Sequence, residues 1–344
     1  MHDTMTLNEA LGRAMTYPKR VVVVGVSHWH STYDAAYIEL LRDMKVDVVG
    51  IADENERIVR NRAERFKVEP FQDYREMIDR TRPDFIVGLG RHVDMPEIFR
   101  HLVETGIPFL MEKPWGVDDV TVRELAELAS KRNSWVCVPY FARYTPWAEV
   151  ARSMVQSGEV GAISHIVFRM IRPTMERYVA WDSPWMLSKK QAGGGALLNL
   201  GSHGFDICRF ITGEEPSVVS AVLSNVVHNS EVEDYAHVTL RTPKGIIFHN
   251  EVGYTLPTWP KNVTDGEQKL AGEKAVVREV AGGVHILGAD RDEMVSAPQG
   301  YVSGCRRVLL ECFERLAVGK PPPITADDCA RAVTLIHDAY RLAQ

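Results

Sequence analysis

A lysine and a histidine lie in two segments of the chain that could present them to a ligand. Lys113 follows an apolar run that ends at Met111, and His203 lies in a glycine-led stretch with a helical pattern, residues 195–211. An imidazole titrates near neutral pH and can take the proton of a hydroxyl, while a lysine ammonium can polarise the same oxygen. The pair indicates proton transfer at a hydroxyl or carbonyl oxygen, although an isolated helical histidine usually packs in the protein and an isolated lysine is usually solvated.

Helical spacing places two further polar side chains near His203. Asn199 precedes it by four residues and would share its face of the helix, and Asp206 follows about one turn later. The Asn199 amide can hydrogen-bond a hydroxyl but cannot accept a proton. Asp206 is better suited to orienting His203 or holding the helix than to reacting. Lys113, Asn199, His203 and Asp206 are therefore the candidate catalytic residues.

The first part of the chain alternates strand-like apolar runs with helical stretches. This alternation is typical of a doubly wound parallel sheet that is covered by helices on both faces. We expect a first domain over residues 1–142 with this α/β architecture. The expected strands are 20–25, 46–52, 85–89, 108–111 and 135–138, and the expected helices are 32–44, 54–66, 95–105 and 117–131.

The pattern changes after Tyr140, where strand-like runs follow one another without helices between them. Such a succession favours an antiparallel or mixed sheet. We expect a second α+β domain over residues 143–344, with a large, mostly antiparallel open sheet and two closing helices, the last capped by Thr325. The expected strands are 163–171, 217–227, 232–240, 245–252, 268–280 and 283–287, and the expected helices are 146–156, 195–211, 302–318 and 326–342.

The turn after the first strand is where a Rossmann-type fold holds the phosphates of a dinucleotide. Gly25 occupies the first position of a G-x-G-x-x-G pattern, but Ser27 and His30 stand at the second and third glycine positions. Side chains would then replace some of the backbone contacts to a pyrophosphate. An ordinary strand-to-helix turn remains the alternative reading of this segment.

The second strand ends in a carboxylate at Asp53, near the spacing expected for a ribose contact. Asp53 could accept hydrogen bonds from the adenosine 2′- and 3′-hydroxyls. Together with Glu54 it would repel a 2′-phosphate, so the sequence favours NAD over NADP. Asp53 could also serve as the cap of the helix expected from residue 54, and the two roles are compatible.

Two motifs in the right order give the chain a family resemblance. Glu112-Lys113-Pro114 resembles the EKP motif of the Gfo/Idh/MocA oxidoreductases, and residues 193–206 resemble that family's GGGxLxDxGxHxxD signature. Ser183-Pro184-Trp185 fits as well, so the resemblance extends from Arg20 over nearly the whole chain. It implies transfer of a hydride between NAD(P) and a secondary alcohol or ketone of a sugar, inositol or related polyol.

The resemblance also implies roles for individual residues and an assembly. Relatives commonly pair through the open face of the second sheet, which implies a homodimer or homotetramer. Substrate contacts would come from Lys113, Arg143, Tyr178, Trp185, Asn199 and His203. The expected cofactor contacts are Gly25, Ser27, His28, Trp29, His30, Asp53, Gly90, Arg91, His92, Met95, Glu112, Lys113 and Pro114.

The chain departs from the family pattern at several of these positions. Asn199 stands where many relatives carry aspartate, and Met95 replaces a familiar nicotinamide-side histidine, for which His92 is the nearby substitute. These changes leave open an NAD-using glycoside-cleaving enzyme and a non-catalytic sugar or dinucleotide sensor. A metal enzyme built on His28-x-His30 is a weaker alternative, because no further ligand spacing supports it.

Composition excludes some partners and suggests a compartment. The net charge is -6 without a basic block, so nucleic acid is not an expected partner. The five cysteines include no CxxC pair and are expected to be reduced. No apolar stretch approaches the ~20 residues of a membrane span, and the first residues resemble a short amphipathic helix rather than a signal peptide. We therefore expect a cytoplasmic protein.

Overall fold

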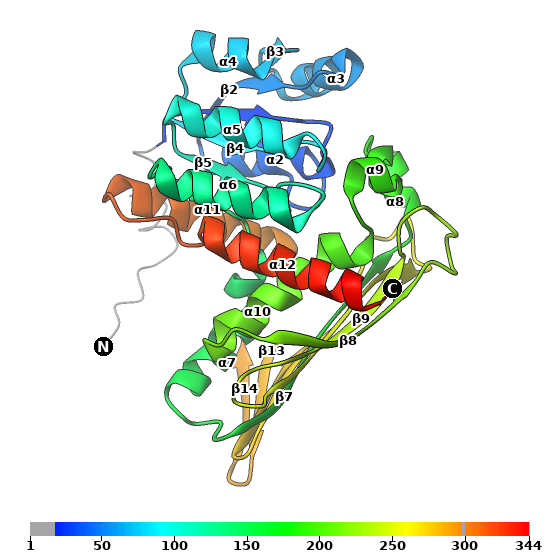
Figure 1. The fold of residues 1–344 in the computed structure, drawn as a ribbon. Coiled ribbons are helices and arrows are strands. Elements are labelled where there is room, and N and C mark those ends of the chain that lie inside the picture. Colours follow the sequence, from blue (N-terminus) through cyan, green and yellow to red (C-terminus); the bar gives the residue numbers. More distant parts are fainter. Residues whose placement is uncertain (1–17, 298–299, 344) are drawn as a thin grey trace.

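The computed structural model describes residues 18–297 and 300–343. The amphipathic helix expected near Leu7 and Leu11 lies outside these residues. The chain forms two β-sheets with helices packed around and between them (Figure 1). Among the described residues, no helix is long and apolar enough to cross a membrane.

The first sheet confirms the predicted Rossmann-type domain. Its six strands are parallel and run in the order β3-β2-β1-β4-β5-β6, so the order reverses between β1 and β4. A ligand crevice is expected at this reversal, at the carboxyl ends of the strands. The strands are β1 Arg20–Val24, β2 Asp47–Ala52, β3 Pro70–Phe71, β4 Phe85–Gly88, β5 Phe109–Met111 and β6 Val136–Cys137; the helices are α2 Tyr37–Asp43, α3 Glu56–Phe66, α4 Tyr74–Thr81, α5 Met95–Thr105 and α6 Asp119–Lys131.

The segment after β1 differs from the prediction of a helix from residue 32. It forms a short 3₁₀ turn, η1 (Trp29–Ser31), and α2 begins only at Tyr37. Asp34 and Ala36 adopt left-handed conformations with φ of 53° and 47°, which interrupt any helix there. The short strand β3 and the helix α4 were also not predicted. The phosphate-binding turn is thus followed by irregular chain rather than directly by a long helix.

The second sheet has eight strands in the order β14-β13-β12-β11-β7-β10-β9-β8. All neighbouring pairs are antiparallel except β7 and β10. The single strand expected over 268–280 is two strands, and β14 was not predicted. The strands are β7 Ile163–Pro173, β8 Ser217–Ser224, β9 Tyr235–Arg241, β10 Ile247–Leu256, β11 Asp265–Gly272, β12 Ala275–Val280, β13 Gly283–Gly288 and β14 Arg291–Ser296.

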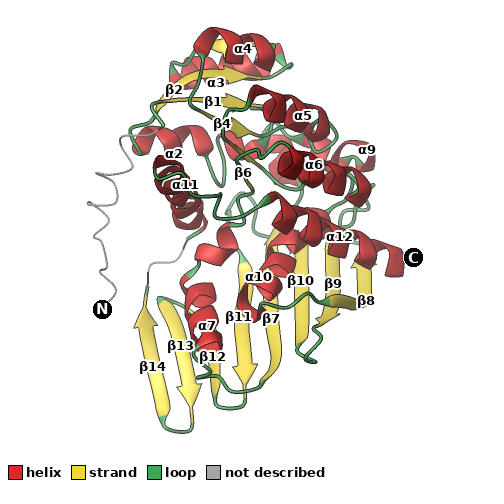
Figure 2. Ribbon diagram, turned by 60° about the vertical axis from the view of Figure 1, so that its left-hand side comes forward, coloured by secondary structure: helices red, strands yellow, loops and turns green. Residues whose placement is uncertain are grey.

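Helices cover one face of this sheet and connect it to the first domain (Figure 2). The last helix contacts α6 of the first domain as well as α10 and β8 of the second. It begins with the predicted cap, in which Thr325 and Asp328 form a reciprocal capping box. The elements are η2 Phe141–Tyr144, α7 Pro146–Gln156, α8 Glu176–Ala180, η3 Pro184–Leu187, α9 Lys189–Ala192, the π-helical turn η4 Leu197–Gly201, α10 Ser202–Thr212, α11 Tyr301–Ala317 and α12 Ala326–Leu342.

Candidate functional site

The turn after β1 requires glycine at its first position. Gly25 has a φ of +76°, and a Cβ added there would lie 2.5 Å from the backbone nitrogen of Gly90. Its own N–H donates to the Ala52 carbonyl at 2.8 Å, which holds the turn against the end of β2. The close approach of Gly25 and Gly90 therefore forms the floor of the crevice where the strand order reverses.

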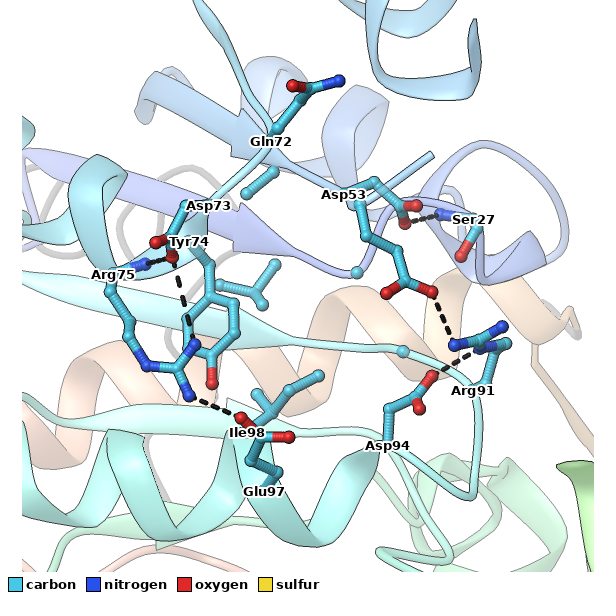
Figure 3. A pocket seen from close by; sticks show the side chains of 15 residues that line it. Ser27, Asp53, Gln72, Asp73, Tyr74, Arg75, Arg91, Asp94, Glu97 and Ile98 are labelled. Carbon is cyan, nitrogen blue, oxygen red and sulfur yellow. Dashed lines mark hydrogen bonds and ion pairs between the residues drawn. The ribbon is translucent and has the colours of Figure 1, made fainter. Parts of the chain in front are cut away.

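A pocket of about 240 Å³ opens above this floor (Figure 3). Its walls come from the ends of β1 and β2, the chain between β3 and α4, and the beginning of α5. Tyr74, Arg75 and Ile98 form the end farthest from the second domain, and sequence reasoning missed all three. The polar and glycine residues that line it include Gly25, Ser27, Asp53, Glu54, Gln72, Asp73, Gly90, Arg91, Asp94 and Glu97.

Asp53 lies at the base of this pocket and is 6% exposed. One carboxylate oxygen accepts a hydrogen bond from the Ser27 N–H at 2.6 Å, and the other accepts from the Asn55 N–H at 2.9 Å. Each oxygen can accept a second hydrogen bond, so ribose hydroxyls fit here. The alternative of Asp53 as the cap of α3 is wrong, because the helix begins at Glu56 and the Asn55 side chain caps it.

Arg91 lies at the rim of the pocket between two carboxylates. Its guanidinium donates to Glu54 at 2.5 Å and also pairs with Asp94. The side chain is 31% exposed, so a phosphate in the pocket could reach it. Of the two arginines that line the pocket, Arg91 lies nearer to Ser27 of the altered glycine turn (Figure 3). Arg91 is therefore placed where a pyrophosphate contact is expected.

A second pocket of about 270 Å³ continues the first toward the second domain. Both are lined by Ser27, Asp53, Glu54 and Arg91, and the second extends to Asp182, Trp185 and Gln191. Together they form one groove from the Tyr74 end to the indole of Trp185. The residues that line the groove extend from the end of β2 to the chain between α8 and α9.

The chain from α8 to α9 is fastened to the phosphate-binding turn. The Ser183 hydroxyl donates to the Ser27 carbonyl at 2.7 Å, and His92 Nδ1 lies 2.7 Å from the Ala192 carbonyl. The Val93 N–H also donates to the Gln191 carbonyl at 3.1 Å. These contacts hold a second-domain segment against the turns after β1 and β4.

Three residues of the altered glycine turn are buried at the domain boundary. His28 stacks on Trp29 with ring centroids 3.9 Å apart, and His30 Nδ1 lies 2.9 Å from Glu112 Oε1. Burial alone would raise the pKa of Glu112, but His30, Lys113 and the Tyr37 hydroxyl together lower it. In the part of the chain that the structure describes, no group of three histidine, cysteine or acidic side chains is placed to hold a metal ion.

Lys113 follows β5 and is 2% exposed. Its ammonium donates to the backbone carbonyl of Asn199 at 2.8 Å and also to the side-chain oxygen of Asn199. Burial lowers the pKa of Lys113 to about 8. The amide of Asn199 supplies no counter-charge, so the lysine loses its proton far more readily than a solvated lysine.

Asn199 is oriented by two tyrosines. Its amide nitrogen donates to the hydroxyls of Tyr178 and Tyr254, each at 2.8 Å, which directs its oxygen toward Lys113. The residue belongs to the π-helical turn η4, a conformation that often marks a functional site. The structure thus brings Lys113, Asn199 and Tyr178 together, and Tyr178 reaches the lysine only through the amide.

His203 lies at the beginning of α10 and is 2% exposed. Its ring centroid is 4.5 Å from that of Phe141 and 5.8 Å from that of Tyr140. Burial lowers the pKa of His203 well below its ordinary value, and the nearby Lys113 and His30 lower it further. Nδ1 has no hydrogen-bond partner among the described residues. His203 is therefore a neutral base close to Lys113.

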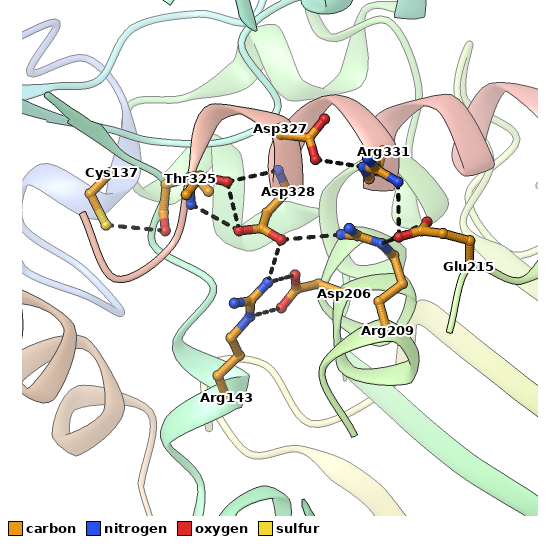
Figure 4. Close-up of polar contacts among 10 residues, drawn as sticks. Cys137, Arg143, Asp206, Arg209, Glu215, Thr325, Asp327, Asp328 and Arg331 are labelled. Carbon is orange, nitrogen blue, oxygen red and sulfur yellow. Dashed lines mark hydrogen bonds and ion pairs between the residues drawn. The ribbon is translucent and has the colours of Figure 1, made fainter. Parts of the chain in front are cut away.

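Asp206 and Arg143 bind each other instead of approaching Lys113 (Figure 4). The Arg143 guanidinium donates to both carboxylate oxygens of Asp206, at 2.7 and 2.5 Å, and pairs with Asp328 at 2.9 Å. Arg209 also reaches Asp328 at 3.3 Å. This network joins η2, α10 and the first turn of α12, so it holds the helix on which His203 lies.

The remaining predicted residues differ in how they are placed. Trp185 packs near His92 with ring centroids 4.9 Å apart, and Met95 is buried at the first turn of α5. Gly90 has a φ of +115°, and Pro114 follows Lys113 through a cis peptide bond. Of the predicted cofactor contacts, Gly25, Ser27, Asp53, Gly90 and Arg91 line the groove, and the other eight are not among its lining residues.

A crevice at the strand-order reversal of a parallel sheet is typical of Rossmann-type dinucleotide-binding proteins. The NAD-binding Rossmann model of the oxidoreductase family GFO/IDH/MocA matches residues 19–140, and the model of the GFO/IDH/MocA C-terminal domain matches residues 149–278. The chain belongs to the GFO/IDH/MocA oxidoreductase family.

Individual relatives are distant in sequence. The rhizopine catabolism protein MocA of Rhizobium meliloti is 30% identical over 33% of this chain and 32% of its own length, so that match spans about a third of each. Myo-inositol dehydrogenase Hyg17 of Streptomyces leeuwenhoekii is 25% identical over 72% of this chain and 73% of its own length. A crystal structure of an Agrobacterium radiobacter oxidoreductase with NAD+, L-tartaric acid and magnesium has a TM-score of 0.81 at 16% identity and covers 94% of this chain and 96% of that one. The last match shows a shared fold.

Proposed function

We propose that this chain is an NAD-dependent dehydrogenase or reductase that acts on a secondary alcohol or ketone of a sugar, inositol or related polyol. The observation that carries the proposal is the buried amine of Lys113, whose pKa is about 8, beside the neutral imidazole of His203. The dinucleotide groove leads to the same domain boundary. The myo-inositol dehydrogenase among the relatives supports a polyol as substrate.

The proposed chemistry divides the work between Lys113 and His203. Bound nicotinamide supplies the hydride acceptor for oxidation and the hydride donor for reduction. During oxidation the substrate hydroxyl loses its proton as its carbon loses hydride. Lys113 donates a hydrogen bond to that oxygen, and His203 takes the proton, because a neutral imidazole is a base. Asn199 holds the Lys113 ammonium in position through its two oxygens.

The substrate itself would enter from the second domain. A cavity of about 370 Å³ lies against β7, β11 and β12, and its lining includes Phe141, which packs on the ring of His203. Trp147 offers an aromatic wall, and Gln268 and Glu279 offer hydrogen-bonding groups, a combination that suits a polyol. Arg143, Tyr178 and Trp185 remain proposed substrate contacts, although Arg143 is already engaged by Asp206.

The test begins with binding and continues with turnover. Calorimetric titration of the cofactor-stripped protein with NAD and NADP should show preferential binding of NAD. A screen of polyols should then reveal accumulation of NADH, which separates a dehydrogenase from a glycoside-cleaving enzyme and from a sensor. Lys113→Ala should lower turnover by about 100-fold or more and keep NAD binding. The control is Lys131→Ala, an exposed lysine on α6. Undiminished turnover in Lys113→Ala would contradict the proposal.

We also propose that the chain works as a cytoplasmic homo-oligomer paired through the second sheet. The face opposite α7 and α10 exposes Val222, Leu287 and Met294 by 62%, 42% and 52%, and a second copy would cover them. All five cysteines are free and buried, which suits a reducing compartment. Sedimentation that shows only a 38.7 kDa species would contradict the assembly.

A further inference from the structure

The cavity of about 370 Å³ in the second domain contains a carboxylate without a partner. Among the described residues that line this cavity, the charged ones are Arg172 and Glu279. The Glu279 carboxylate has no hydrogen bond or ion pair with any residue that the structure describes, and burial raises its pKa with no opposite charge to lower it. A carboxylate that leaves water without gaining a donor or a counter-charge is destabilised. A ligand that supplies both would therefore bind favourably beside Glu279.

Arg172 does not balance this charge, because it is paired elsewhere. Its guanidinium lies 2.9 Å from the carboxylate of Asp34 in the first domain. It also donates to the side chains of Asn262 at 2.9 Å and Thr264 at 2.6 Å. Arg172 in turn lowers the pKa of Asp34, which keeps that carboxylate ionised. The charges of Arg172 and Asp34 cancel, so the cavity is left with the negative charge of Glu279.

Glu279 lies in a row of side chains on the floor of the cavity. Its strand, β12, pairs with β11 in a register that sets Lys269 opposite Arg278. The next residues along, Gln268 and Glu279, therefore lie side by side on the other face of the sheet, and both line the cavity. Gln268 is in turn opposite Phe168 of β7. An aromatic ring, an amide and the carboxylate thus follow one another across three strands.

The helix side of the cavity leads from this floor to His203. Phe141 lines the cavity and packs on the ring of His203 with centroids 4.5 Å apart. Ile207, another lining residue, lies one helical turn after His203 on α10. Trp147 of α7 adds a second aromatic wall, and aromatic faces attract cations. A ring with a hydroxyl at His203 would therefore turn its other substituents toward the sheet and Glu279.

We propose that the substrate is an amino-substituted sugar or polyol and that Glu279 binds its ammonium group. The ammonium would donate to the Glu279 carboxylate, and Gln268 would accept from the same group or from a neighbouring hydroxyl. A neutral polyol supplies the hydrogen bonds but not the charge, and an anionic substrate would be repelled. The amino group is bound and not transformed. The inference rests on the function proposed above and names the substrate class for that site.

The test uses sets of ligands that differ at one substituent, which is an ammonium, a hydroxyl or a neutral amide. Glucosamine, glucose and N-acetylglucosamine form one set, and an amino-deoxy-inositol, inositol and the N-acetylated amine form the second. Each compound is titrated by calorimetry into the protein in excess NAD, and NADH formation is followed separately. Glu279→Gln keeps the shape of the side chain and removes its charge. The matched control is Glu267→Gln, on the neighbouring strand β11, where the side chain is 44% exposed near Arg169.

In at least one set, wild type should bind the amine about 10-fold more tightly than both neutral compounds, the difference between a charged and a neutral hydrogen bond. Glu279→Gln should remove this preference, and Glu267→Gln should keep it. The assignment is overturned if wild type prefers the amine in neither set, a comparison that requires no variant to fold, or if the preference survives in Glu279→Gln.

Turnover separates this inference from the function on which it rests. NADH formed as efficiently from the neutral compounds as from the amines would overturn the assignment and leave the dehydrogenase function standing. Amine binding that depends on Glu279, without NADH from any compound, would support the amine site and count against the dehydrogenase function.

Discussion

Replacing Asn199 by aspartate should restore the counter-charge that Lys113 lacks. The pKa of Lys113 is about 8 instead of the ordinary 10.5 because burial disfavours the ammonium and nearby Glu112 only partly offsets that effect. The Asn199 side chain that its ammonium contacts is a neutral amide. An opposite charge within hydrogen-bond distance raises a lysine pKa by about 1–3 units. In Asn199→Asp we therefore expect Lys113 to titrate near its value in the unfolded chain, at about 9 to 11.

This change has a measurable effect on stability. In wild type, between pH 8 and about 10.5, Lys113 is mostly protonated in the unfolded chain and mostly deprotonated in the folded chain. Because the unfolded chain binds more protons, Lys113 makes the free energy of unfolding rise with pH over this range. Between pH 8 and pH 9.5 the contribution is about 1.5 kcal/mol, and in Asn199→Asp it should fall to about 0.7 kcal/mol or less. The buried cysteines, such as Cys208, act in the opposite direction because burial raises their pKa values, but they do so equally in both proteins.

The assay is urea unfolding at pH 8 and pH 9.5 for wild type and Asn199→Asp. The quantity compared is the change in unfolding free energy between the two pH values, from which the shared contributions cancel. Asn250→Asp is the control, because Asn250 is a second buried amide whose side chain donates to the Gly201 carbonyl and not to Lys113 or its partners. Equal pH dependence in wild type and Asn199→Asp would refute the low pKa of Lys113 and its cause.

Three further substitutions test the rest of the site. Gly25→Ala should destabilise the fold by about 1–3 kcal/mol and weaken NAD binding, since the new Cβ meets Gly90; unchanged melting and affinity would contradict this. Asp53→Ala should weaken NAD binding by about 10-fold and should weaken NADP binding by a smaller factor. Calorimetry measures both affinities, and an equal loss for the two cofactors would argue against the ribose contact. Arg143→Met should cost about 3–5 kcal/mol in urea unfolding, because it leaves Asp206 buried without its partner, and a loss below about 1 kcal/mol would be inconsistent with the pairing.

Periodic segments with clear end signals could be predicted from the sequence. The closing helix has a continuous apolar stripe and a capping threonine, and it was predicted with its observed bounds, Ala326–Leu342. The parallel sheet was predictable for the same reason, since its central strands are uninterrupted apolar runs. Strand β3 has only two residues, too few for an alternating pattern, so β3 and the α4 helix after it were missed.

Elsewhere the local pattern was ambiguous or misread. Residues 32–44 have helical spacing, but left-handed Asp34 and Ala36 delay α2 to Tyr37, and no sequence signal marks them. The division of 268–280 into two strands could have been predicted from Gly272, because a glycine inside a strand pattern often marks an interruption. Gly272 is the last residue of β11, and a Cβ at this position would lie 2.3 Å from the Val160 carbonyl oxygen.

Site residues could be predicted where their placement follows from the strand or helix next to them in the sequence. They could not be predicted where the placement depends on contacts between residues far apart in the sequence. The places of Lys113 and His203 in the fold were predictable because each lies at the end or beginning of a recognisable element, whereas their catalytic roles stay predictions. The pairing of Arg143 with Asp206 joins residues 63 positions apart, and one sequence does not show which of several carboxylates an arginine selects. For the same reason Tyr254 escaped notice, although it orients the Asn199 amide.

The pairing of carboxylates determines how the proposed reaction can handle its proton. Glu112 Oε1 accepts from the Tyr37 hydroxyl and lies against His30, and the pKa of Glu112 is lowered by His30, Lys113 and Tyr37. Both oxygens of Asp206 accept from Arg143, so neither carboxylate is well suited to act as a base. Asn199 contributes an amide where an aspartate would supply a charge. The proton of a substrate hydroxyl must then pass to a nitrogen base, and both nitrogen bases in the site have pKa values lowered by burial. Neutral His203 is the stronger candidate as acceptor at pH 7, because Lys113 is still largely protonated at that pH and serves as the donor to the substrate oxygen.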